Sequence, residues 1–185
     1  MKYYPPQLIE NLSIPDNTVN EYLREHCPGE DVVAIHYYGV DITWKHVFKM
    51  ADKTARALRG MGFGEGDQIP VFLRATPEFV YLLLGAEKIG ASLLCRDNTL
   101  EENVEAVRKS KAKVIFAHDY MSQEELKTFR RDSETRCVVT VSPYNSACYS
   151  EIPEHIRTAI DEYYPDEPAY GPKALDWNLF LKLGE

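Results

Sequence analysis

The sequence predicts an α/β fold: a mostly parallel sheet covered by helices, with a small hairpin near the N-terminus. Between Ile42 and Ala117, segments with apolar residues at helical spacing alternate with short β-branched segments, and the connections are short. This alternation is typical of βαβ units, which place consecutive strands parallel in one sheet. The 185 residues are 44% hydrophobic and 27% charged, an ordinary globular composition for a single domain with a substantial core.

The N-terminal part of the chain predicts an arm, a short helix and a hairpin. Residues 1–16 contain three prolines and are expected to be extended. Thr18 is expected to begin a short helix. The segment Val32–Tyr38 is rich in β-branched and aromatic residues, and Gly39 turns it into a second strand over Val40–Thr43. His36 lies within the first strand, where we expect a packed or edge histidine.

The first long helix is expected to begin after Thr43, whose side chain can cap the free N–H groups of the first turn. Its buried stripe comprises Trp44, Val47, Phe48, Ala51, Ala55 and Leu58. Gly62 and Gly64 end the helix, and a strand over Ile69–Leu73 follows. The glycines up to Gly66 follow a helix and precede a strand, whereas a phosphate-binding loop runs from a strand into a helix. We therefore interpret them as a helix stop and a turn.

The second helix is expected to begin after Thr76, with Pro77 in its first position and Glu78 facing the positive end of the helix dipole. From Phe79 to Ala86 it has no polar face, so it should be buried on most sides. Gly90 ends it, and a short strand over Ala91–Cys95 follows.

The third helix has a complete capping box, Thr99 with Glu102, and leads to a strand over Lys113–Ala117. The basic residues between Arg108 and Lys113 are interpreted as a solvated helix end that complements the dipole. A further capping box, Ser122 with Glu125, begins the fourth helix, and a strand over Cys137–Val141 completes an α/β core that we place at residues 17–141.

Residues 142–185 predict an irregular helical run-out. A loop over Ser142–Ser150 precedes an amphipathic helix with Pro153 in its first turn, and Pro165–Leu175 is expected to be another loop. Asp176 caps a last short helix, whose apolar residues have no evident partner in the sequence pattern. These apolar residues are Trp177, Phe180 and Leu181.

Composition excludes several classes of function. The formal net charge of −8 argues against a general nucleic-acid-binding protein. The four cysteines are widely spaced, which fits a reducing compartment and predicts neither a disulfide framework nor a zinc site. The first residues do not predict a signal peptide, and the longest apolar run, Phe79–Ala86, is too short to span a membrane. We expect a cytoplasmic protein with no metal site.

The sequence carries no recognisable catalytic constellation. It has no G-x-S-x-G motif, no suggestive pairing of cysteine and histidine, and no lysine after a glycine-rich loop, so no catalytic residue is predicted. Two loops, Arg74-Ala75 and Arg96-Asp97-Asn98, run from a strand into a helix. Ligands of open α/β sheets bind beyond the carboxyl ends of strands, where an arginine beside a helix N-terminus can hold a phosphate.

Several short motifs occur in a characteristic order and spacing. They are Tyr38-Gly39 leading to Ile42-Thr43-Trp44, Ala55-x-x-Leu58-x-x-Met61-Gly62, Gly66-Asp67, Thr76-Pro77-Glu78-Phe79, Lys88-Ile89-Gly90-Ala91 and Ala112-Lys113-Val114-Ile115. In this order the chain resembles the N-terminal region of AMP-forming acyl-CoA ligases, members of the adenylate-forming superfamily. The resemblance extends from about Asn17 to His118.

The resemblance implies that the full-length parent activates a carboxylic acid, either a fatty or an aryl acid. The acid would react with ATP in the presence of Mg²⁺ to give acyl-AMP, and coenzyme A would then displace AMP. The family's Ser/Thr/Gly-rich ATP loop does not occur before Glu185. We therefore interpret residues 1–185 as an N-terminal fragment of the large N-terminal domain, or as a naturally shortened product. Alone it is expected to be an inactive scaffold that binds no cofactor.

In related ligases the second of the two loops lies near the docking site of the coenzyme A nucleotide. Arg96 is therefore the one candidate binding residue, for a coenzyme A phosphate; the alternative is a surface arginine balanced by Asp97. The expected partners are the remainder of the chain and a small carboxylic acid, without nucleic acid or a transmembrane segment.

Two other classes of protein remain open at this stage. The chain could belong to the adenylation domain of a nonribosomal peptide synthetase, which has the same N-terminal architecture. It could instead be a stand-alone, non-catalytic binding module of flavodoxin-like shape.

Overall fold

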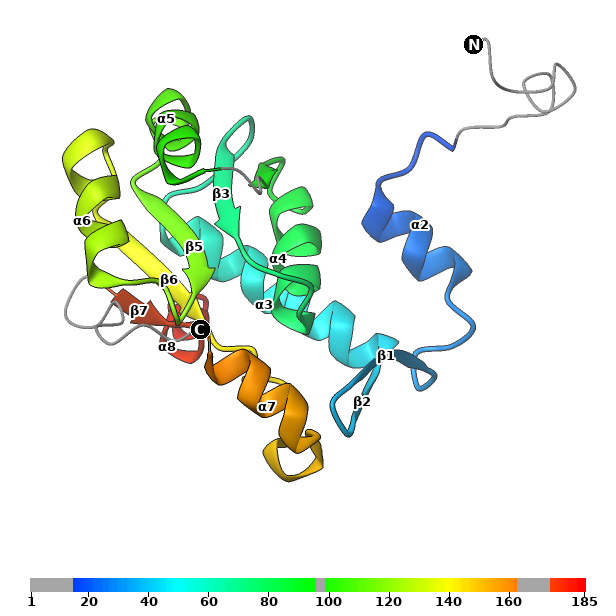
Figure 1. Ribbon diagram of the computed structural model, residues 1–185. Helices are drawn as coiled ribbons and strands as arrows, with labels where there is room; N and C mark the ends of the chain where they lie inside the picture. Colours follow the sequence, from blue (N-terminus) through cyan, green and yellow to red (C-terminus); the bar gives the residue numbers. More distant parts are fainter. Residues whose placement is uncertain (1–14, 96–98, 163–173) are drawn as a thin grey trace, which may run out of the picture.

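A computed structural model describes residues 15–95, 99–162 and 174–185 (Figure 1). Most of the expected arm at residues 1–16 and most of the expected loop Pro165–Leu175 lie outside the described residues. The candidate residue Arg96 and its neighbour Asp97 also lie outside them.

The centre of the molecule is a parallel five-stranded sheet, as the sequence predicts. In spatial order its strands are β4 (Ser92–Cys95), β3 (Gln68–Phe72), β5 (Val114–His118), β6 (Cys137–Val141) and β7 (Ala174–Asp176). The first strand in sequence, β3, therefore has β4 on one side and β5 on the other. This is the strand order of flavodoxin-like sheets, in which the chain reverses direction across the sheet beside the first strand.

A separate hairpin precedes the sheet, as predicted. Strands β1 (Val33–Tyr37) and β2 (Val40–Thr43) pair antiparallel. Both turn residues have positive φ angles, 40° at Tyr38 and 77° at Gly39. Two consecutive positive angles define the type I′ turn that suits a two-residue hairpin connection, and glycine at the second position adopts this conformation without strain.

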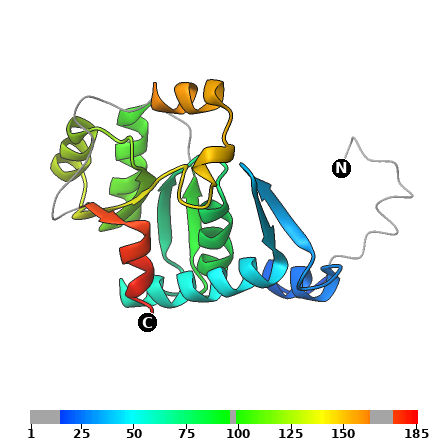
Figure 2. The same cartoon turned by 90° about the horizontal axis from the view of Figure 1, so that it is seen from below.

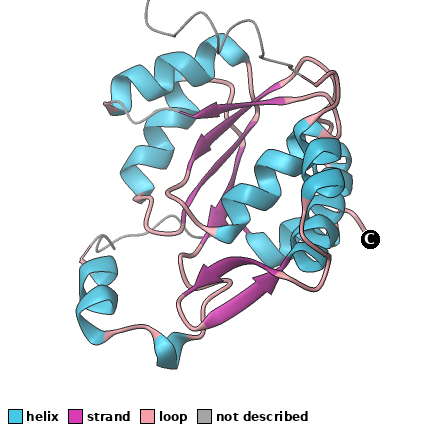
Figure 3. Ribbon diagram, turned by 90° about the vertical axis from the view of Figure 1, so that its right-hand side faces the viewer, coloured by secondary structure: helices cyan, strands magenta, loops and turns pink. Residues whose placement is uncertain are grey.

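Helices cover both faces of the sheet (Figure 3). On one face lie α3 (Trp44–Gly60), α4 (Pro77–Glu87) and α8 (Trp177–Lys182), and on the other lie α5 (Leu100–Ser110) and α6 (Gln123–Asp132). Alternate residues of β5 serve the two faces: Phe116 belongs to the first apolar cluster, and Ile115 and Ala117 belong to the second. Figure 2 shows α3 running from the hairpin to α8.

Two further helices lie outside these layers. Helix α2 (Val19–His26) packs against α4, and its capping box is formed by Thr18 and Glu21. Helix α7 (Glu154–Asp161) contains no buried residue, although its sequence predicts an amphipathic helix.

The predicted helix starts are confirmed. The side chains of Thr43, Thr76, Thr99 and Ser122 each accept a hydrogen bond from the backbone N–H three residues later. The glycine-rich segment forms a turn, with φ angles of 89° at Gly62 and 82° at Gly66. Helix α4 is buried on most sides, with the exception of Leu83, which is 44% exposed.

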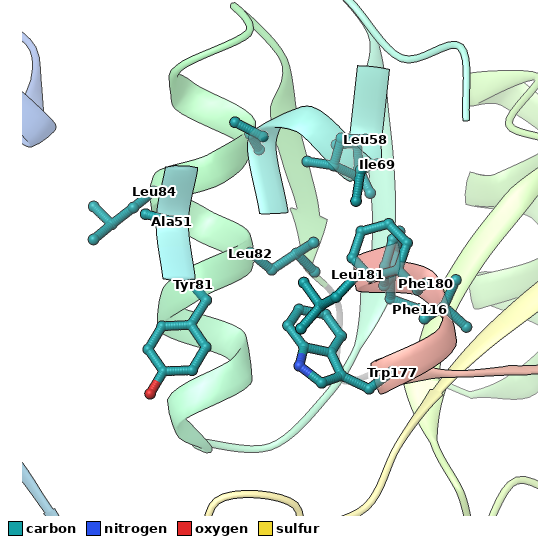
Figure 4. Close-up of a cluster of buried hydrophobic side chains, with 14 of the residues drawn as sticks. Ala51, Leu58, Ile69, Tyr81, Leu82, Leu84, Phe116, Trp177, Phe180 and Leu181 are labelled. Atoms are coloured by element: carbon teal, nitrogen blue, oxygen red, sulfur yellow. The ribbon is translucent and has the colours of Figure 1, made fainter. Parts of the chain in front are cut away.

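The C-terminal segment differs from its prediction. Leu175 belongs to strand β7, not to a loop, because three residues are too few to give a periodic pattern. The last helix also has a partner: Trp177, Phe180 and Leu181 are at most 4% exposed. The Phe180 ring lies 5.2 Å from that of Phe116 in the centre of the sheet (Figure 4). Residues 174–182 therefore complete the core instead of trailing from it.

Candidate functional site

A cleft of about 610 Å³ lies where β3 and β5 end. We call it cleft 1. These are the two strands between which the chain changes direction across the sheet, and open α/β sheets bind their ligands at the carboxyl ends of such a pair. The lining residues are Phe72, Leu73, Arg74, Leu100, Asn103, His118, Tyr120, Met121, Glu125 and Phe129.

The floor of cleft 1 is fixed by His118, the last residue of β5. Its Nε2 accepts a hydrogen bond from the backbone N–H of Arg74 at 2.6 Å. Its Nδ1 lies 3.2 Å from the carbonyl oxygen of Val141, to which it donates. One imidazole therefore joins the ends of β3, β5 and β6. Burial lowers the pKa of His118 to about 4, so at neutral pH the ring is uncharged, with its proton on Nδ1.

The remaining lining groups come from the loops after β3 and β5 and from helices α5 and α6. Arg74 follows β3, and the ring of Tyr120 stacks on that of His118 with 4.6 Å between centroids. Helix α5 contributes Asn103, and α6 contributes Glu125. Cleft 1 thus combines a guanidinium, an aromatic face and an amide, groups that together bind a phosphate and a flat ring.

The carboxylate of Glu125 is already held within the capping box of α6. It accepts hydrogen bonds from the backbone N–H and the hydroxyl of Ser122, both at 2.8 Å. Arg74 and Glu125 both line cleft 1. The Glu125 carboxylate also stabilises the start of α6 through its two hydrogen bonds with Ser122.

The one site residue predicted from the sequence, Arg96, lies outside the described residues, and Arg74, from the other strand-to-helix loop, lines cleft 1. His118 and Tyr120 did not emerge from the sequence. The signal that could have found them is their position at the end of the predicted strand Lys113–Ala117, because the rule that pointed to the two strand-to-helix loops applies to every strand of a parallel sheet. His36 is an edge residue of the hairpin, with Nδ1 2.6 Å from Asp41 Oδ1.

A second cleft, cleft 2, of about 420 Å³ lies between the hairpin and the loop after β6. Its lining residues are Val40, Asp41, Ile42, Thr43, His46, Asn145, Ser146 and Ala147. Within the described part of the chain no group of three or more histidine, cysteine, aspartate or glutamate side chains could hold a metal ion. No helix among the described residues combines the length and apolar character needed to cross a membrane.

The model of the AMP-binding enzyme family matches residues 24–172. This match covers most of the chain, and the chain belongs to that family. The matched region includes the hairpin, strands β3 to β6 and both clefts.

Curated relatives include both nonribosomal peptide synthetases and acyl-CoA synthetases. A nonribosomal peptide synthetase of Penicillium rubens is 33% identical over 47% of this chain and 4% of its own length. Acetyl-coenzyme A synthetase of Dictyostelium discoideum is 27% identical over 58% of this chain and 17% of its own length. The chain therefore spans less than a fifth of the length of either relative.

Solved structures with the same fold are adenylate-forming ligases. Coronafacic acid ligase of Pectobacterium brasiliense has a TM-score of 0.62 at 11% identity, over 88% of this chain and 28% of its own. A benzoate CoA ligase of Burkholderia xenovorans has a TM-score of 0.56 at 18% identity, over 82% of this chain and 30% of its own. At these identities the likeness establishes the fold.

Proposed function

We propose that the chain is the N-terminal scaffold of an ATP-dependent acid–CoA ligase. The ligase activates a carboxylic acid, fatty or aryl, as acyl-AMP and transfers the acyl group to coenzyme A. The observation that carries this proposal is cleft 1, at the strand-order reversal of a chain that belongs to the AMP-binding family. We assign the ligase to the cytoplasm.

In this proposal cleft 1 forms a wall for the nucleotide end of coenzyme A. Arg74 faces the phosphates, and Arg96, in the next strand-to-helix loop, remains a candidate for the same role. The ring of Tyr120, held by its stack on His118, offers a face for the adenine. The neutral His118 fixes the backbone at Arg74 without adding a charge. These groups bind and orient the cosubstrate, and none of them performs a chemical step.

We propose that the activation half-reaction uses groups outside the described residues of this chain. When bound, ATP would supply the phosphates, and Mg²⁺ would offset their negative charge. The described residues contain no set of metal ligands, and the sequence contains no Ser/Thr/Gly-rich ATP loop. We therefore assign the ATP and Mg²⁺ sites to other parts of the ligase and expect the 185-residue chain alone to be inactive.

A second candidate is the adenylation domain of a nonribosomal peptide synthetase. The 33% identity to the Penicillium rubens synthetase favours it. Both candidates form an acyl-adenylate, and they differ in the acid that is activated and in the thiol that receives it.

The test is an ATP–pyrophosphate exchange assay on the product of the complete open reading frame, with panels of fatty, aryl and amino acids. Exchange with a fatty or aryl acid, followed by coenzyme A-dependent thioester formation, is the expected result. Exchange with amino acids, and transfer only to a carrier-protein thiol, would replace the ligase with the second candidate. Absence of exchange with every acid would overturn both. The 185-residue chain is the control and should release no pyrophosphate.

A further inference from the structure

A buried carboxyl group lies in the first turn of α4, outside cleft 1. Glu78 is 1% exposed, and its Oε1 accepts a hydrogen bond from the hydroxyl of Ser146. Its Oε2 is buried without a hydrogen-bond partner. None of the ion pairs in the described part of the chain includes Glu78. Loss of hydration is the largest influence on this carboxyl group and outweighs the interactions with Ser146, Thr76 and the Glu78 backbone, which favour the carboxylate, so the balance favours the neutral acid.

Besides the positive end of the α4 dipole, the titratable groups near Glu78 include two tyrosines, a histidine and an aspartate. Tyr81 follows it by one helical turn, and Tyr37 approaches from β1; burial raises the pKa of both tyrosines, and the nearby Glu78 charge adds to the effect. From α3, the exposed ring of His46 lies 6.0 Å from that of Tyr81. Asp41 of β2 is acidic and lines cleft 2. Burial accordingly raises the pKa of Glu78 above its ordinary value.

Ser146 belongs to the segment that we call the flap, residues 142–147, which leaves β6 at the carboxyl edge of the sheet. Both ends of the flap are anchored. The carbonyl of Val141 accepts a hydrogen bond from the N–H of Asp119 at 3.1 Å, and the N–H of Cys148 donates to the carbonyl of Tyr38 at 3.2 Å.

Between these anchors, three side-chain hydrogen bonds connect the flap to other elements. The Tyr37 hydroxyl donates to the carbonyl of Pro143 at 2.8 Å, and the Tyr144 hydroxyl donates to Asp161 Oδ1 at 2.9 Å. The third is the bond from Ser146 to Glu78. It is the one of the three that ends on a buried acid.

We propose that Glu78 and Ser146 form a proton-operated latch that holds the flap closed over cleft 2. While Glu78 is neutral, it stays buried and accepts the Ser146 hydrogen bond. When Glu78 loses its proton, the charged carboxylate must reach water, which breaks that bond and detaches the centre of the flap from α4. Residues 145–147 then move away from β2, and cleft 2, which they line together with His46, opens.

Hydrogen exchange of the flap amides, followed by mass spectrometry across a pH series, tests the latch in the 185-residue chain. After correction for the intrinsic pH dependence of exchange, protection of the amides of residues 144–147 should fall by about tenfold for each pH unit above the pKa of Glu78, because opening releases one proton. Protection of β5 and β6 should stay constant. Flap protection that does not change with pH would overturn the proposal.

Two variants separate the acid from its partner. Glu78→Gln keeps an acceptor for Ser146 but cannot ionise, so its flap should remain protected throughout the series. Ser146→Ala removes the donor, so its flap should be poorly protected at every pH. Glu102→Gln is the matched control, because Glu102 also accepts a bond from a hydroxyl, that of Thr99 at 3.2 Å, but is exposed. A Glu78→Gln variant that follows the wild-type curve would contradict the latch.

A direct titration makes the test independent of any variant. The carboxyl carbon of Glu78 can be followed by NMR in the wild-type chain. The latch requires a midpoint above the ordinary value for glutamate, at the same pH at which flap protection begins to fall. A midpoint at or below the ordinary value would refute it.

Discussion

His118 and Glu78 are both buried and ionisable, yet they differ in how completely their polar atoms are satisfied. His118 is 4% exposed and has hydrogen-bond partners on both ring nitrogens. Glu78 is 1% exposed and has a partner on one of its two oxygens. Burial alone therefore does not define the role of an ionisable side chain. The fully bonded imidazole joins three strands, whereas the half-bonded acid is held only while it remains neutral.

The two groups also have opposite effects on how the free energy of unfolding changes with pH. The neutral form of His118 is favoured by folding, so the unfolded chain takes up its proton first as the pH falls. The neutral form of Glu78 is favoured as well, but for an acid this means that the folded chain holds its proton longer as the pH rises. His118 therefore opposes folding in acid, and Glu78 opposes it at higher pH.

The largest expected effect comes from His118→Ala. The substitution removes two buried hydrogen bonds and leaves a cavity where three strands end, which should lower the free energy of unfolding by about 2–4 kcal/mol. Urea denaturation at pH 7.5 measures it. His36→Ala is the matched control, because the His36 side chain is 79% exposed and its loss should change stability by less than about 0.5 kcal/mol. Equal losses in the two variants would contradict the structural role of His118.

The Glu78→Gln variant tests whether ionisation of Glu78 destabilises the folded chain as the pH rises. Below the ordinary glutamate pKa, wild type and variant should have similar pH slopes. Above it, the stability of the wild-type chain should fall as the pH rises towards the raised pKa of folded Glu78, while the variant lacks this decline. The stability gap, measured as the difference in urea midpoint, should therefore grow with pH in favour of the variant. A gap that stays constant would mean that Glu78 titrates normally.

At acidic pH we attribute the change in unfolding free energy with pH to His118. Between pH 6.5 and about 4 the wild-type chain should lose stability as the pH falls, since only the unfolded state binds the imidazole proton in this range. In the His118→Ala variant this loss should be reduced, whereas His36→Ala should retain it. An acid limb that survives unchanged in His118→Ala would assign it to other groups.

A smaller effect is expected from Arg74→Ala, which leaves the backbone bond to His118 in place and removes the guanidinium from cleft 1. Affinity for coenzyme A should fall by up to about tenfold, because one charge-assisted contact to a phosphate is lost. The unfolding free energy should barely change. Arg59→Ala, which removes an exposed guanidinium bonded to the carbonyl of Lys88, is the control and should bind as the wild type does. Unaltered affinity in Arg74→Ala would remove Arg74 from the proposed site.

Much of the fold could be predicted because its signals are local. The caps at Thr76 and Thr99 and the turn at Gly39 each depend on a few neighbouring residues, and the structure confirms them. The apolar stripes of α3 and α4 are likewise read along one helix.

The features that escaped prediction depend on long-range contacts. From the sequence, Glu78 is a favourable acid at a helix start; its burial under Ser146, which lies 68 positions away, appears only in three dimensions. The same is true of His118, whose partners are Arg74, just after β3, and Val141 of β6. It is also true of α8, whose apolar residues pack on the sheet after β7. An apolar stripe on a helix predicts that its residues are buried, but it does not predict which residues they pack against.

The most direct test of cleft 1 is an NMR titration of the product of the complete open reading frame with coenzyme A. We predict saturable shifts of amides around Arg74, Asn103 and Tyr120, with little change around Asn145 and Ser146 of cleft 2, and the same pattern with adenosine 3′,5′-bisphosphate alone. Shifts confined to cleft 2, or no saturable shift at any residue, would contradict the assignment of cleft 1 as the nucleotide wall of the ligase.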